Sequence, residues 1–133
     1  MREIKFRAKR ADTGAWVYGD LTHVQKICSV EEIQRNGRRS ELVVRVANND
    51  VDEETIGQYT GLKDRDGDEI YEGDILCFRD IKGVQYLFEV VYEDGAFCFS
   101  HYRERAFTEL RHHNLNKYIV NGNIHDNPEL LIE

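Results

Sequence analysis

The start of the chain alternates hydrophobic with basic residues. In the segment "IKFRAK" at 4–9, each hydrophobic residue is followed by lysine or arginine, and this period of two is typical of a half-buried β-strand. The turn-forming triplet Asp12-Thr13-Gly14 comes next, and "WVY" at 16–18 is again rich in strand-forming residues. The pattern predicts a β-hairpin at the start of the chain.

Residues 29–37, "SVEEIQRNG", follow a different pattern. Ser29 and Glu32 are spaced as in a capping box, and Asn36-Gly37 is a typical helix end. We therefore expect a helix of two turns at most, which needs tertiary packing to persist. The β-branched segment "ELVVRVA" at 41–47 predicts a strand, and the polar stretch "NNDVDEET" after it predicts a surface connection.

From Gly73 onward, short hydrophobic segments alternate with compact turns. "DILCF", "VQYLFEVVY" and "AFCFS" are separated by "RDIKG" and "EDG", a spacing typical of a meander in a small barrel or sandwich. The segment "YIV" at 118–120 predicts a last strand. Within residues 100–113 the period changes to four, through Tyr102, Ala106 and Leu110, which predicts an amphipathic helix.

Length and composition fit one compact domain spanning residues 1–133, since 41% of the residues are hydrophobic and 32% are charged. No hydrophobic run approaches the ~20 residues that cross a bilayer, and "MREIKFRAKR" has no hydrophobic segment of the kind found in signal peptides. We therefore expect a cytoplasmic protein without membrane contact. The three cysteines Cys28, Cys77 and Cys98 are widely spaced, which predicts buried reduced thiols.

Negative charge is concentrated in one segment. Residues 50–74 hold ten acids and two bases, whereas the rest of the chain is nearly neutral. The stretch "LKDRDGDEIYEGDIL" within it suggests a calcium loop, but with Gly67 at the glycine position the first and last ligands would be Leu62 and Gly73. A register that starts at Asp64 places Glu69 where glycine is required. We therefore expect no metal site here.

The same stretch is also unsuited to catalysis. Asp66-Gly67 is a hairpin-turn signal, so the carboxylates around it should be solvated, whereas general acid catalysis needs a desolvated carboxyl. We expect Gly73 to provide backbone freedom and Asp74 to cap local amides where the next strand starts, while the tyrosines pack. The histidines form no ligand pattern; they are His23, His101, His112, His113 and His125.

No other motif for catalysis or cofactor binding is present. The chain lacks a P-loop, a dinucleotide-binding fingerprint, a zinc-protease motif and a serine or cysteine nucleophile signature. The sequence therefore predicts no catalytic, cofactor-binding or metal-binding residues, and it leaves enzymatic activity unsupported.

Basic residues form three local patches. They are Arg2, Lys5, Arg7, Lys9 and Arg10; Arg35, Arg38 and Arg39; and Arg103, Arg105 and Arg111. Small barrels bind single-stranded nucleic acid through basic grooves with stacking aromatics, and Phe6 lies within the first patch. Alternating bases on a strand are also typical of a solvated face or of a protected sheet edge. Both interpretations stay open.

Three stretches of the chain resemble the YopX-like proteins of phages and prophages. They are "FRAKRADTGAWVYGDL" at 6–21, "VDEETIGQYTGLKDRDGDEIYEGDIL" at 51–76 and "GNIHDNPELL" at 122–131. The combination "GQYTGLKD…IYEGD" is the most specific of these. The resemblance implies a mainly β architecture, an SH3-like barrel with a helical element, and no established activity. The family often has a tryptophan after "FRA", where this chain has Lys9 and Arg10.

Together these features predict a mainly β protein with a minor α component, a small SH3-like or meander barrel with one amphipathic helix. We expect a non-enzymatic phage or prophage accessory protein that binds a protein partner or self-associates, with the acidic segment 50–74 available to a basic partner. The alternative is a nucleic-acid-associated barrel that uses the basic N-terminal hairpin. It predicts binding that weakens steeply with salt.

Overall fold

A computed structural model describes residues 3–101, 107–110 and 114–131. Contacts divide the chain into two compact units, which we call the N-terminal unit (Lys5–Ile56) and the C-terminal unit (Gly57–Glu133, with Met1–Ile4). We describe each unit by itself, and a single domain over residues 1–133 stays a prediction. The described residues are mostly β-strand with one α-helix, which confirms the mainly β class. Closure into an SH3-like barrel also stays a prediction.

The N-terminal unit opens with the predicted hairpin. Strands β1 (Phe6–Lys9) and β2 (Trp16–Gly19) pair antiparallel, with Phe6 opposite Gly19. The turn between them is closed by the Arg10 amide, which donates to the Ala15 carbonyl at 2.9 Å. Gly14 has a φ of 74°, a conformation that favours glycine.

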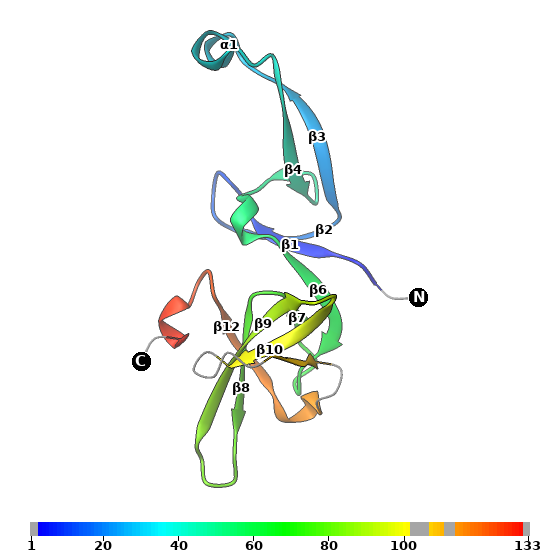
Figure 1. Ribbon diagram of the computed structural model, residues 1–133, viewed down its shortest axis with the longest axis vertical. Helices are drawn as coiled ribbons and strands as arrows, with labels where there is room; N and C mark the ends of the chain where they lie inside the picture. Colours follow the sequence, from blue (N-terminus) through cyan, green and yellow to red (C-terminus); the bar gives the residue numbers. More distant parts are fainter. Residues whose placement is uncertain (1–2, 102–106, 111–113, 132–133) are drawn as a thin grey trace. The chain divides into compact units, whose positions relative to one another are not determined.

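A long ribbon follows this hairpin. Strands β3 (Leu21–Ile27) and β4 (Ser40–Val46) pair antiparallel along seven residues each, and the short β5 (Asn49–Asp50) returns beside β4. The helix α1 (Val30–Asn36) joins β3 to β4 at the end of the ribbon away from β1 and β2 (Figure 1). We call β3, α1 and β4 together the arm.

The ends of α1 follow the prediction. The Ser29 side chain accepts from the Glu32 amide, and the Glu32 carboxylate accepts from the Ser29 amide, so the capping box is present. Gly37 ends the helix with a φ of 74°. The core of the unit lies elsewhere, at the base of the arm, and consists of Ala8, Val46 and Val51 packed against Phe6, Val17, Leu21 and Ile56. The connection predicted after β4 contains β5 and the 3-10 helix η1 (Glu53–Thr55).

The C-terminal unit contains the predicted meander. The hairpin of β6 (Gly57–Lys63) and β7 (Glu69–Tyr71) precedes an antiparallel sheet in the order β11-β10-β9-β8-β12. The strands of this sheet are β8 (Asp74–Arg79), β9 (Gln85–Glu93), β10 (Ala96–His101), β11 (Phe107–Glu109) and β12 (Ile119–Asn123). Short 3-10 helices, η3 (Leu115–Lys117) and η4 (Pro128–Leu131), flank β12. Ile70, Leu76, Val90, Phe99 and Leu110 form the core.

The predicted amphipathic helix over residues 100–113 is wrong. Ser100 belongs to β10, and residues 107–109 form β11, in which Phe107 is opposite Ser100 and Glu109 is opposite Cys98. Pairing with β10 satisfies the backbone of this segment, and this tertiary effect outweighs a four-residue period carried by only three positions. Tyr102 and Ala106, on which the prediction also rested, lie outside the described residues.

Candidate functional site

The acidic stretch that leads into β8 holds several backbone segments together through hydrogen bonds. Asp66-Gly67 forms the predicted turn between β6 and β7, with Gly67 at a φ of 83°. The Asp64 carboxylate lies under this turn: its Oδ1 accepts from the amides of Asp66 and Asp68, both at 2.9 Å. Its Oδ2 accepts from the amide of Val120 at 2.9 Å. One side chain therefore holds the turn closed and ties it to β12.

The second half of the stretch starts the next strand, as predicted. Gly73 has a φ of 91°, its amide donates to the Val90 carbonyl, and its carbonyl accepts from the Ile124 amide. The Asp74 Oδ2 accepts from the Tyr71 amide at 2.7 Å. Gly73 and Asp74 therefore stabilise the passage from β7 into β8, which confirms the structural interpretation of this motif.

The prediction that the carboxylates around Asp66-Gly67 are solvated needs a correction at Asp64. Asp66 and Asp68 are exposed, but Asp64 and Asp74 are only 5% and 1% exposed. Both buried carboxylates accept hydrogen bonds from backbone amides, which is how a protein stabilises a charge away from water. They hold the backbone in place, and the turn signal alone could not distinguish them from their solvated neighbours.

The tyrosines of the motif pack, as predicted. Tyr59 and Tyr71 are opposite each other on β6 and β7, with ring centroids 5.5 Å apart, and both are buried. Close packing also explains Gly57, where a Cβ atom would lie 2.5 Å from the Glu72 carbonyl oxygen. This part of the motif therefore serves packing.

The cysteines are free and buried, as expected. Burial raises the pKa of the Cys98 thiol above its usual value, and the nearby carboxylates act in the same direction, so this thiol is a poor nucleophile. Within the described ranges, no three His, Cys, Asp or Glu residues are grouped to hold a metal ion. His112 and His113 lie outside those ranges, and the absence of cofactors and metals stays a prediction.

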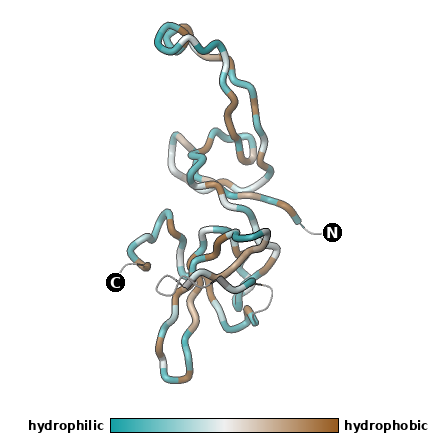
Figure 2. Tube along the Cα trace, viewed as in Figure 1, coloured by the Kyte–Doolittle hydropathy of each residue, from teal (hydrophilic) through white to brown (hydrophobic). Residues whose placement is uncertain are grey.

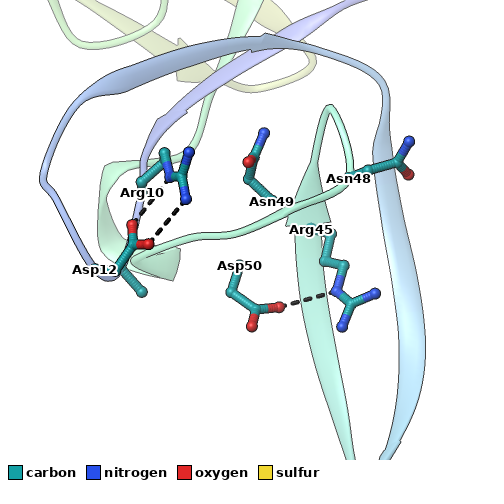
Figure 3. Close-up of a pocket in the computed structure, with 7 residues that line it drawn as sticks. Arg10, Asp12, Arg45, Asn48, Asn49 and Asp50 are labelled. Carbon is teal, nitrogen blue, oxygen red and sulfur yellow. Dashed lines mark hydrogen bonds and ion pairs between the residues drawn. The ribbon is translucent and has the colours of Figure 1, made fainter.

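An open groove lies where β1 ends near the turn from β4 to β5 (Figure 3). Its volume is about 510 Å³, and Arg10, Asp12, Arg45, Asn49 and Asp50 are among its lining residues. Arg10 donates two hydrogen bonds to Asp12, at 2.9 and 2.8 Å, and Arg45 donates to Asp50 at 2.9 Å. Each guanidinium already has a carboxylate partner, so the groove offers little net charge to a ligand.

The basic N-terminal hairpin is largely occupied by contacts within its own unit. The Arg7 guanidinium lies 4.8 Å and the Lys9 ammonium 5.5 Å from the centre of the Trp16 ring, typical cation–π distances. Arg7 is only 6% exposed, and Arg10 is paired with Asp12. Four arginines of the predicted basic patches lie outside the described residues: Arg2 of the first patch, and Arg103, Arg105 and Arg111 of the third. The hairpin therefore presents less free positive charge than its sequence suggests.

The arm is the main exposed hydrophobic feature of the N-terminal unit. Ile27, Val30 and Leu42 have exposed fractions of 85%, 71% and 62%, and α1 buries no residue. Because Ile27 is opposite Ser40 in the ribbon, it lies diagonally beside Leu42 on one face. In Figure 2, hydrophobic positions form a continuous stretch along β4, whereas along β3 they are separated by hydrophilic ones. The sequence did not predict this exposed hydrophobic surface, because the pattern that identifies a strand does not show whether another segment covers it.

Comparison with known proteins identifies the family. The YopX protein family matches residues 5–132. In the crystal structure of protein EF1440 from Enterococcus faecalis, the solved chain is 27% identical, the match covers 98% of this chain and 99% of that one, and the TM-score is 0.59. No curated protein matches the chain. No helix within the described ranges is long and hydrophobic enough to span a bilayer. The chain belongs to the YopX family.

Proposed function

We propose that this chain is a non-enzymatic phage or prophage accessory protein that binds another protein, or a second copy of itself, through the arm. Membership of the YopX family supports an accessory role. The observation that carries the proposal is the exposure of Ile27, Val30 and Leu42 on an arm whose helix buries none of its residues.

The arm has little to stabilise it within its own unit. Isolated two-stranded hairpins are marginally stable in water, and a seven-residue helix is well below the length at which helices persist alone. Only the base of the arm, at Leu21 and Val46, reaches the core. A partner that covers the outer part would supply the missing packing, since fully burying one large aliphatic side chain contributes about 1.5–3 kcal/mol.

The arm is a better candidate than the acidic segment for the main contact. Asp64 and Asp74 are buried, and Asp50 pairs with Arg45 and Lys26. At least three of the ten acids of segment 50–74 are therefore buried or paired within the chain and are not available to a basic partner. The remaining exposed acids can contribute to the rate of encounter, which is the usual effect of charges at the rim of an interface.

Substituting Ile27 by aspartate tests this proposal, with Ile4→Asp as the matched control. Both isoleucines are exposed, at 85% and 55%, but Ile4 precedes β1 and lies outside the arm. Sedimentation velocity over a range of concentrations measures self-association, and cross-linked capture from prophage-induced cells measures other partners. We expect Ile27→Asp to abolish the assembly or the capture and Ile4→Asp to preserve it. A monomer that captures no specific protein, or equal behaviour of both variants, would contradict the proposal.

The nucleic-acid alternative through the N-terminal hairpin has less support. Arg7 and Lys9 contact Trp16, and Arg10 contacts Asp12, so the hairpin has few cations left for phosphates. This alternative predicts that removing charge at Lys5 and Arg7 weakens binding and lowers its salt dependence.

A further inference from the structure

A cleft in the C-terminal unit lies beside the turn of the β8–β9 hairpin. Its volume is about 420 Å³, and its lining residues are Arg65, Phe78, Arg79, Asp80, Ile81, Asn116 and Lys117. They come from the β6–β7 turn, from β8 with the turn after it, and from η3. Three separate parts of the unit therefore form one site.

Backbone and turn contacts fix the walls of this cleft. The Arg65 amide donates to the Tyr118 carbonyl at 2.9 Å, which holds the β6–β7 turn against the end of η3. On the other side, the Asp80 Oδ1 accepts from the amides of Lys82 and Val84, both at 2.9 Å, and shapes the β8–β9 turn. One wall of the cleft is therefore shaped by an aspartate that accepts from backbone amides, as Asp64 does in the β6–β7 turn.

The charge around the cleft is locally positive. The C-terminal unit as a whole has more acids than bases, yet Arg65, Arg79 and Lys117 are all exposed and line this cleft. Of the nearby carboxylates, Asp80 is engaged in its turn and Asp66 pairs with Arg65. Within the described ranges, no carboxylate pairs with Arg79 or Lys117. Arg79 donates one hydrogen bond, to the neutral Gln85 at 3.4 Å, so both cations keep their positive charge for an anion.

Phe78 is the aromatic residue among those that line the cleft. Phe78 lies between two tyrosines, with its ring centroid 6.1 Å from that of Tyr86 and 5.4 Å from that of Tyr118. Tyr118 continues the row into the core through Phe99, at 5.0 Å. The row is anchored at its inner end, while Phe78 is half-buried and Tyr86 is exposed, so aromatic surface is present beside the cations.

We propose that this cleft binds single-stranded nucleic acid, with phosphates beside Arg79 and Lys117 and a base stacked on Phe78. Cations that follow the backbone, together with aromatic rings that stack on bases, are how proteins hold single strands without reading their sequence. An acidic peptide would use the cations but would gain no stacking. The residues of the cleft belong to the C-terminal unit, whereas the arm and the β1–β2 hairpin belong to the N-terminal unit.

Fluorescence anisotropy with a fluorescein-labelled thymidylate oligonucleotide tests the proposal. Two phosphate contacts on a single strand give a slope of about −1.4 for log affinity against log salt, so the affinity should fall about sevenfold between about 50 and about 200 mM salt. Unlabelled polyglutamate of similar length should compete poorly. No binding at low salt, or competition by polyglutamate as strong as that by unlabelled oligonucleotide, would overturn the proposal.

Matched charge reversals locate the site. Arg79→Glu and Lys117→Glu should each weaken binding at least severalfold, whereas Arg38→Glu, the same change at an exposed position on the other unit, should not. Phe78→Leu keeps the side chain hydrophobic but removes its ring, and it should weaken binding without changing the salt slope. If all three charge reversals bind alike, the proposal is wrong. These results do not depend on the arm, so the two proposals stand or fall separately.

Discussion

The hydrogen bonds of Asp64 give a sharp prediction for stability. Asp64→Ala removes a carboxylate that is 5% exposed and that accepts hydrogen bonds from three backbone amides, two in the β6–β7 turn and one from Val120. The turn then loses its connection to β12, while the fold around it stays the same. The expected effect is a loss of stability larger than that caused by replacing the exposed acids of the same turn, Asp66 and Asp68, with alanine.

The size of the effect follows from these contacts. A hydrogen bond to a charged group contributes about 1.5–3 kcal/mol. Water can replace the bonds to the exposed Asp66 and Asp68, whereas the Val120 amide is partly shielded. We therefore expect Asp64→Ala to cost about 3 kcal/mol. Asp64→Asn should cost about 2 kcal/mol. The side-chain oxygen of asparagine can still accept from backbone amides, but its NH₂ group would face a backbone N–H, which is also a donor.

Urea unfolding followed by far-UV circular dichroism measures this difference, and hydrogen exchange at Val120 localises it. The control is Asp66→Ala, which removes an exposed carboxylate from the same turn and its ion pair with Arg65. Such a pair contributes about 0–1 kcal/mol. If Asp64→Ala destabilises the protein no more than Asp66→Ala, the structural role given to this motif is wrong.

Three further substitutions test other parts of the structure. Gly57→Ala should cost about 1–3 kcal/mol in urea unfolding, because its Cβ would lie 2.5 Å from the Glu72 carbonyl oxygen. Ser29→Ala should cost about 1 kcal/mol of helix stability. The Ser29 amide lowers the pKa of Glu32, so the cap stabilises α1 above the usual carboxyl pKa, and this contribution is lost as the pH falls through the lowered value. Amide exchange of α1 in the associated protein, where the proposal expects the helix to be protected, measures both effects. Burial raises the pKa of Glu89, so the native state binds the carboxyl proton of Glu89 more tightly than the unfolded state does, and the stability falls as the pH rises. Glu89→Gln should therefore raise Tm at about pH 8 and much less at about pH 4.

Much of the local structure was predictable because it depends on neighbouring residues. The Ser29–Glu32 capping box, the Asp66-Gly67 turn and the strand start at Gly73-Asp74 each involve groups only a few residues apart. Such contacts have sequence signatures that do not depend on the rest of the fold.

Features that depend on distant parts of the chain were not predictable. The burial of Asp64 requires Val120, which is 56 residues away. Strand β11 forms because β10 is available to pair with it, although the local period indicated a helix. The arm is exposed because no other described segment of its unit packs over it, and a strand pattern does not show this. The cleft at Phe78 is formed by three segments that come together only in the folded unit. One sequence without its tertiary contacts carries no signal for these features.

Hydrogen exchange of the arm tests the proposed function most directly. The amides of Ile33 and Gly37 donate within α1 and its cap, to the carbonyls of Ser29 and Ile33. In dilute, dissociated protein these amides should exchange nearly as fast as in an unfolded peptide, while that of Val90 in the C-terminal core stays protected. They should gain protection when the protein self-associates or meets its partner. Strong protection of α1 in the dissociated protein, with no change on association, would contradict the proposal that a partner completes the arm.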